Sequence, residues 1–283
     1  MTKRSKMQFY PSAITISGSD SGGGAGVAAD LRTFNALGVF GTCAITAVAA
    51  ANPVAIRRID ALPGQSVAAQ IDAVMEKIAV RYGKTGVLFS AETVCAVADS
   101  IKKHQLKVVC DPVIFSADNS RLLQDDALEA LQEKLLLRSS WITPGIREAE
   151  LLADMKISST EDMLAAAATL GKKYSAAIYL RNTAAGNKTV TDVIFKDGKL
   201  YTLNSPSVNF APFAGYGTGC TLSASLAAML TLDLPWKQAV CESRAFVYGS
   251  QMQSVEIGAG VITMYPPSED TIHLIKLAEV ENA

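Results

Sequence analysis

Histidine is scarce in this chain of 283 residues, and its scarcity narrows the chemistry open to the protein. Only His104 and His273 occur, far apart and without neighbouring ligand residues. A histidine-based metal centre or a Ser-His-Asp triad is therefore disfavoured. The five cysteines include no Cys-x-x-Cys pair, and their odd number favours reduced thiols in a cytoplasmic protein.

Charge of one sign and long apolar runs are also lacking. The net charge is -1, which gives no electrostatic reason to expect nucleic acid or an anionic membrane as a partner. The first apolar stretch, at residues 13–17, is too short for a signal core or a membrane span. With 49% hydrophobic and 19% charged residues, the chain can bury a sizeable core, and we expect a small-molecule substrate.

Short apolar segments alternate with helical ones along the chain. Strands are expected at 13–17, 42–48, 85–88, 107–110, 140–143 and 176–180, with a hairpin at 190–203 around Asp197-Gly198. Helices are expected at 25–37, 63–78, 91–104, 127–137, 147–152, 161–173, 218–232 and 235–255. This alternation predicts an α/β fold, with a mostly parallel sheet flanked by helices on both faces.

One domain is predicted, because neither a repeat nor a Pro-, Gly- or Ser-rich linker interrupts the chain. We expect a flexible tail at residues 1–10, a single domain at 11–265 and a C-terminal extension at 266–283. Several polar or glycine-rich segments follow strands: residues 18–26, Asp111, Thr143 and Arg181. Ligands of such sheets bind beyond the carboxyl ends of the strands, so these segments are expected to share one edge.

The most informative stretch is Gly217-Thr218-Gly219-Cys220, which opens an apolar helix. Free N–H groups and the helix dipole make such a start an anion site, suited to phosphate. A thiol in the first turn is expected to have a lowered pKa. A phosphate cradle beside an ionisable group suits phosphoryl transfer, although an ordinary helix cap with a small buried cysteine fits the local pattern equally well.

Three further side chains are candidates with open alternatives. Asp111 ends a strand and could support Mg²⁺ or phosphate chemistry, or simply form a turn. Glu148 could cap a helix or reach a metal through water, and Arg181 could touch a phosphate or face solvent. The glycine turn at 22–26 is neither a Walker loop nor a clean dinucleotide fingerprint, so alone it is a weak signal.

Together these segments resemble the ribokinase-like superfamily, and within it the hydroxymethylpyrimidine/phosphomethylpyrimidine kinases of thiamine biosynthesis. The resemblance runs from about residue 11 to 262 and is densest at residues 14–38, 111–113, 142–144 and 217–224. Cys220 is its most specific element, since most ribokinase-like enzymes carry Asp there whereas pyrimidine and pyridoxal kinases carry Cys.

The resemblance implies a ribokinase-like fold with about eight central strands, a homodimer, and transfer of the ATP γ-phosphoryl group with Mg²⁺ as cofactor. It implies that Cys220 is the catalytic base and that the N–H groups of Gly217, Thr218 and Gly219 hold the phosphoryl group. Asp111 and Arg181 would bind the nucleotide, and Glu148 would position the metal. The residues implied to border the pyrimidine are Gly18, Asp20, Gly24, Asp30, Ala51 and Val87.

Five places depart from the family pattern. They are Ala51 for Gln or Glu, Gly145 for Asn, residues 181–184 for Lys-Gly-Gly-His, residues 117–119 for Lys-Ser-Gly, and Tyr216 for His. Ala51 cannot read a polar ring by hydrogen bonds, which matters for specificity. The alternatives are therefore a pyridoxal- or pyridoxine-type kinase, which Ala51 favours, and a non-catalytic ligand-binding or regulatory homologue, which the altered nucleotide and metal motifs favour.

Overall fold

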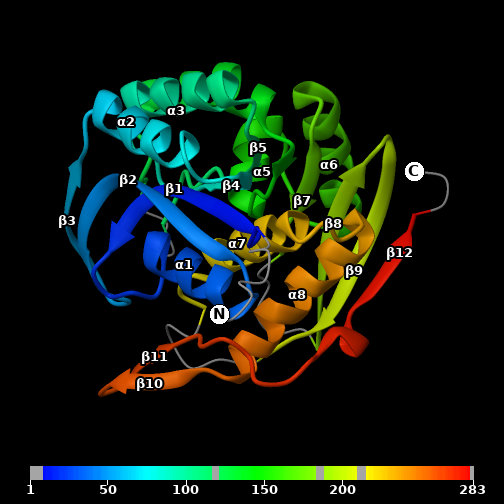
Figure 1. Cartoon of the computed structure of the whole chain (residues 1–283). Coiled ribbons are helices and arrows are strands. Elements are labelled where there is room, and N and C mark those ends of the chain that lie inside the picture. Colours follow the sequence, from blue (N-terminus) through cyan, green and yellow to red (C-terminus); the bar gives the residue numbers. More distant parts are fainter. Residues whose placement is uncertain (1–8, 117–120, 183–187, 209–214, 281–283) are drawn as a thin grey trace, which may run out of the picture.

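A ten-stranded sheet runs through the centre of the computed structural model, which describes residues 9–116, 121–182, 188–208 and 215–280 (Figure 1). Its order is β12-β9-β8-β7-β6-β5-β4-β1-β2-β3. The strands are β1 (Ser12–Asp20), β2 (Phe40–Ala51), β3 (Ile56–Ala61), β4 (Val80–Thr85), β5 (Lys107–Cys110), β6 (Trp141–Ile142), β7 (Ala177–Leu180), β8 (Thr189–Lys196), β9 (Lys199–Pro206) and β12 (Lys276–Glu279).

Six strands that are neighbours in the sheet run parallel, as the alternating pattern predicted: β2, β1, β4, β5, β6 and β7. β3 is antiparallel at one edge, and β8, β9 and β12 are antiparallel at the other. β10 (Val255–Gly258) and β11 (Val261–Thr263) form a separate hairpin. The sheet thus has more strands than the eight or so implied by the resemblance, because both edges are extended.

Helices cover both faces. They are α1 (Gly26–Ala36), α2 (Gly64–Met75), α3 (Ala91–His104), α4 (Asp125–Ala130), α5 (Ile146–Ala153), α6 (Thr160–Tyr174), α7 (Thr218–Thr231) and α8 (Trp236–Met252), with short turns η1 (Leu131–Leu135), η2 (Leu136–Arg138) and η3 (Ile272–Leu274). Within the described ranges, none of the helices is long and apolar enough to cross a bilayer.

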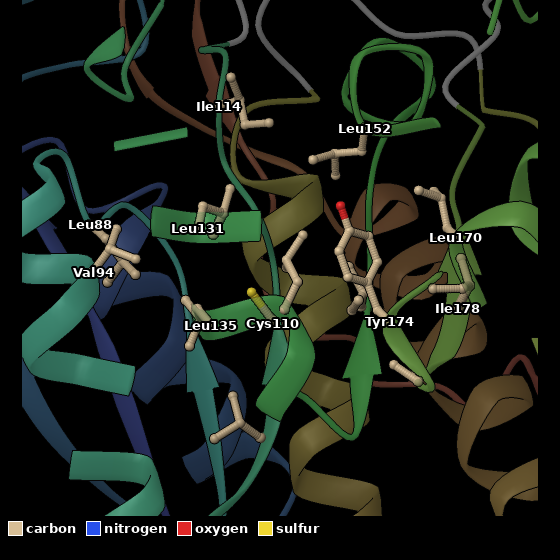
Figure 2. Close-up of a cluster of buried hydrophobic side chains, with 14 of the residues drawn as sticks. Leu88, Val94, Cys110, Ile114, Leu131, Leu135, Leu152, Leu170, Tyr174 and Ile178 are labelled. Atoms are coloured by element: carbon tan, nitrogen blue, oxygen red, sulfur yellow. The ribbon is translucent and has the colours of Figure 1, made fainter. Parts of the chain in front are cut away.

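Two apolar cores lie on opposite faces of the sheet, because side chains alternate along each strand. Ile14 and Ile16 of β1 join the core under α2, α3 and α6, whereas Ala13 joins the core under α1, α7 and α8. Figure 2 shows part of the first core, where Val94 and Leu88 approach Leu131 and Leu135 beside Cys110.

Three expectations for local structure are wrong. The strand expected at 85–88 is β4, which ends at Thr85, because Arg81 and Lys84 interrupt its apolar pattern. The helix expected at 127–137 is α-helical only to Ala130 and continues as a π turn and a 3-10 turn. The helix expected to reach 255 ends at Met252, and β10 follows.

Two strands of the ten-stranded sheet were not anticipated, and neither was the hairpin of β10 and β11. β3 lies at the exposed edge and is rich in charge, so it shows little apolar pattern. β12 lies in the segment expected as a C-terminal extension, and it pairs with β9 over four residues. Most of the expected N-terminal tail, and the departures at 117–119 and 183–184, lie outside the described residues.

Candidate active site

The parallel strands bring the candidate residues to one edge of the sheet. Asp20 ends β1, Ala51 ends β2, and Asp111 directly follows β5. Arg181 follows β7 and donates its backbone N–H to Pro144 O, 3.0 Å away, beyond the end of β6. This is the edge at which open α/β sheets bind ligands.

Cys220 lies in the first turn of α7 and receives a hydrogen bond from the N–H of Gly26, the first residue of α1. Two helix N-termini therefore meet at its sulfur, and their dipoles favour negative charge there. Burial nevertheless raises the pKa of Cys220 to about 11; the Lys84 ammonium and the Gly26 N–H lower it, and the carboxylates of Asp30 and Asp111 raise it. The expected lowering of this pKa is wrong, because desolvation outweighs the favourable charges.

Gly217 caps α7 in the left-handed region at φ +83°, which favours glycine. A Cβ at this position would lie 3.0 Å from the carbonyl carbon of Gly24. Residues 217–219, here called the cradle, therefore pack against the glycine turn. The N–H of Thr218 donates to Gly215 O at 3.1 Å. Of the three amides expected to hold phosphate, that of Thr218 therefore has a partner within its own loop.

The glycine turn is organised by Asp20. Its Oδ1 accepts from the N–H of Gly22 and its Oδ2 from the N–H of Ala25, each at 2.9 Å. Tyr216 donates its hydroxyl to Asp20 Oδ2 at 3.1 Å, and its ring lies against Gly24. Asp20 thus joins the turn to the loop that precedes the cradle, and Tyr216 is a site residue that the sequence marked only as a departure.

Ala51 and Gly18 border the same side of the site. Ser21 donates its hydroxyl to Ala51 O at 2.7 Å and accepts from Ala51 N–H at 2.9 Å. Gly18 faces Val87, whose Cβ lies 3.6 Å from the position that a Cβ at Gly18 would take. The residues implied to border the ring therefore lie near one another, and all but one of them could contact a ligand directly.

Asp30 is that exception, because its side chain is fully buried. Its Oδ2 accepts from Lys84 Nζ at 2.9 Å and from Thr15 Oγ1 at 2.6 Å. Burial opposes the charge on Lys84, but Asp30 and the other nearby anions hold the pKa of Lys84 above its usual range. Direct contact between Asp30 and a ligand would require this ion pair to open.

Asp111 and Glu148 lie on either side of Arg181 and are both buried. Arg181 Nη2 lies 2.9 Å from Asp111 Oδ1 and 3.4 Å from Glu148 Oε2. Burial raises the pKa of Glu148, Arg181 lowers it and Asp111 raises it further. The hydroxyl of Ser223, which the sequence did not single out, lies 3.4 Å from Asp111 Oδ2.

A divalent metal does not fit these residues as a resident cofactor. In the described part of the chain, no three His, Cys, Asp or Glu side chains gather as metal ligands. The two carboxylates near the cradle already hold a guanidinium, whose positive charge would repel a cation. Magnesium held by one or two carboxylates usually takes its other ligands from water and from substrate phosphates, so its place would be with a bound nucleotide.

Lys84 was missed as a site-forming residue, although one signal was available. It is a lysine inside a short apolar segment, which requires either exposure or a charged partner. Its partner is 54 residues away in sequence, so the pair itself could not be read from local pattern.

The fold and this edge define a ribokinase-like kinase. Pyridoxal kinase from Staphylococcus aureus, solved in complex with AMP-PCP, superposes with a TM-score of 0.86 at 25% identity, covering 96% of this chain and all of that one. Phosphomethylpyrimidine kinase from Clostridium difficile 630 superposes with a TM-score of 0.73 at 30% identity, covering 84% of this chain and 97% of that one.

The chain belongs to the phosphomethylpyrimidine kinase family, whose model matches residues 20–265. Among curated relatives, the hydroxymethylpyrimidine/phosphomethylpyrimidine kinase of Haemophilus influenzae is 38% identical over 259 residues, which is 90% of this chain and 96% of that protein. The resemblance on the motifs around Cys220 is thus confirmed over nearly the whole chain.

Proposed function

We propose that this protein transfers the γ-phosphoryl group of ATP to the hydroxymethyl group of hydroxymethylpyrimidine, and then to the phosphate of the monophosphate product. The observation that carries the proposal is the meeting of α1, α7 and Cys220 at one point. Family membership supports the substrate class, because the curated relatives that match most of the chain carry this activity in their names.

In the first transfer, the acceptor hydroxyl oxygen forms a bond to the γ-phosphorus while the bond to the β,γ-bridging oxygen breaks. The thiolate form of Cys220, which is a minor form at neutral pH because burial raises the pKa of the thiol, accepts the hydroxyl proton at Sγ. ADP leaves with the electron pair of the broken bond. The N–H groups of Gly217 and Gly219 and the dipole of α7 stabilise the charge on the migrating group. In the second transfer, a phosphate oxygen takes the place of the hydroxyl.

Magnesium enters this scheme as part of the MgATP substrate. Asp111 and Arg181 would then lie beside the nucleotide phosphates, and Glu148 would act on the metal only from a distance. We further propose a cytoplasmic homodimer. The exposed edge strand β3, with Val54 and Ile56 more than a third exposed nearby, is a surface that a second copy would cover.

A pyridoxal-type kinase is the second candidate, because one observation favours it. The side chain of Ala51 offers a ring only a methyl group, and its backbone N–H and C=O already form hydrogen bonds with Ser21. The similarity to pyridoxal kinases at a TM-score of 0.86 supports the same possibility.

A coupled assay of ADP release tests both candidates. We expect turnover with hydroxymethylpyrimidine and its monophosphate, and kcat/KM for pyridoxal and pyridoxine lower by at least about tenfold. The reverse preference would favour the second candidate. If none of these four compounds causes ADP release, but calorimetry shows that a ring binds, the non-catalytic homologue is favoured.

A further inference from the structure

Three of the four carboxylate oxygens of the Asp111–Glu148 pair already have a hydrogen-bond donor. Asp111 Oδ1 accepts from Arg181, whereas Asp111 Oδ2 lies 3.4 Å from the hydroxyl of Ser223, which lies closer to Gly219 O, at 2.9 Å. Glu148 Oε1 accepts from the N–H of Ile114 at 3.0 Å, and Oε2 accepts from the N–H of Gly145 at 2.8 Å as well as from Arg181. A metal ion at this pair would have to displace these donors.

Arg181 is fixed in place by more than the two carboxylates. Its Nε donates to Thr143 O at 2.9 Å, and its backbone pairs with Gly145 in an isolated parallel bridge. The side chain is only 15% exposed. A planar guanidinium with donors in a rigid fork suits this three-point arrangement, which a lysine ammonium could not reproduce.

The guanidinium also lies directly on the phosphate cradle. A Cβ at Gly219 would come 2.8 Å from Arg181 Cζ, so only glycine leaves room for the group there. On the opposite side, a Cβ at Gly145 would lie 3.9 Å from Arg181 Cζ and 3.6 Å from Glu148 Oε2. A longer side chain at 145 would therefore press on the guanidinium.

We propose that Arg181 is the resident cation of this site. It offsets one of the two negative charges of the Asp111–Glu148 pair where a metal would otherwise bind, and its guanidinium faces an anion on the cradle. The protein without nucleotide therefore has no divalent-metal site at these carboxylates. This proposal deepens the proposed function, because the anion would be the nucleotide phosphates.

Titration of Mn²⁺ into the nucleotide-free protein, followed by the EPR signal of free Mn²⁺, tests the proposal directly. We expect no stoichiometric binding to the unmodified chain. Arg181→Met keeps the length of the side chain but removes its charge, and we expect it to bind one Mn²⁺ at least about tenfold more tightly. Adding Asp111→Asn to Arg181→Met is expected to abolish that binding.

Arg181→Lys provides a second route if Arg181→Met fails to fold. A lysine cannot bridge both carboxylates and Thr143 O together, so we expect Mn²⁺ affinity between those of the unmodified chain and Arg181→Met. One tight Mn²⁺ in the unmodified chain that Asp111→Asn removes would overturn the proposal. So would unchanged Mn²⁺ affinity in both Arg181 variants. Neither readout requires turnover, so failure here is distinguishable from failure of the ADP-release assay.

Discussion

Cys220 combines a favourable position with an unfavourable pKa. Its sulfur receives the Gly26 N–H beside the cradle, yet burial keeps the thiol protonated at neutral pH. We expect Cys220→Ser to lower kcat by about 100-fold or more, since a positioned proton acceptor is worth that much, with ADP affinity changed less than about twofold. Steady-state kinetics and calorimetry measure the two effects, and a nearly full rate would contradict the assignment.

The same pKa predicts the pH dependence of alkylation at Cys220. A pKa raised to about 11 leaves the reactive thiolate a minor form at neutral pH, and its fraction grows as pH rises towards that value. Labelling by iodoacetamide, followed by mass spectrometry of the Cys220 peptide, should therefore accelerate about tenfold per unit between about pH 7 and about pH 9. A plateau in that window would show a lower pKa.

We expect the side chain at position 51 to affect how tightly a polar ring binds. We expect Ala51→Gln to tighten hydroxymethylpyrimidine binding roughly fivefold to tenfold, because it adds one or two hydrogen bonds to a polar ring. Ala51→Leu has a similar length without polar atoms, so it serves as the matched control and should weaken binding. Titration calorimetry measures both. Equal affinities in the two variants would count against the pyrimidine assignment.

Individual residues differed in how far sequence could predict them. Cys220, Asp111 and Arg181 stood at the ends of recognisable elements, so their convergence on one edge followed from topology. Lys84 and Ser223 act through partners far away in sequence, and only the folded sheet brings them there. The direction of the Cys220 pKa was missed because the depth of burial is not encoded in the first turn of α7.

At the scale of elements, the cradle and the glycine turn form one unit through Gly217 and Gly24. We expect Gly217→Ala to reduce both stability and kcat/KM for two reasons. The new Cβ would collide with the backbone of Gly24, and alanine would have to adopt a positive φ. Gly198 is the matched control: it has φ +78° and nothing within 4 Å of its added Cβ. Gly198→Ala should cost only about 1 kcal/mol of backbone strain.

Thermal unfolding and steady-state kinetics of the two alanine variants separate strain from contact. If both variants lose the same stability and keep an unchanged kcat/KM, the packing of the cradle on the glycine turn does not contribute to catalysis.

Lys84 ties β4 to α1 through Asp30. Removing one partner of a buried pair leaves the other charge without compensation, so Lys84→Met should lower the free energy of unfolding by about 3–5 kcal/mol. Lys103→Met is the matched control. Lys103 pairs with Asp72 at 2.8 Å but is 62% exposed, so its loss should cost less than about 1 kcal/mol. Urea denaturation measures both, and similar values would mean that the buried pair adds little.

Element boundaries failed where charge or irregular helix interrupted the apolar pattern. The apolar pattern of β4 is interrupted by Arg81 and Lys84, and that of β3 by Arg57, Arg58 and Asp60, so neither strand could be located from the pattern. The change from α4 to a π turn at Leu131 leaves no mark in composition. The parallel order of the inner strands, by contrast, followed from the alternation of apolar and helical segments.

At the scale of the whole molecule, the C-terminal segment belongs to the sheet. β12 pairs with β9, and Thr271 donates to Ala245 O of α8 at 2.9 Å. We expect truncation after residue 265 to lower the melting temperature by roughly 5 °C or more, since it exposes a strand edge and apolar surface. Hydrogen exchange should accelerate at the amides of β9. Glu279→Ala keeps β12 but removes the contacts of this side chain with Lys199 and Tyr201, so it is the control and should change the melting temperature and the hydrogen exchange far less.

Gly217 packs against Gly24, so the loop that we propose for the acceptor and the loop that we propose for the phosphoryl group are in direct contact. A larger acceptor that pushes on Gly24 would also shift the amides ahead of the sulfur. In descendants of this chain, a change in acceptor preference should therefore come paired with a change in the loop before α7, and laboratory evolution towards a bulkier vitamin precursor should select both together.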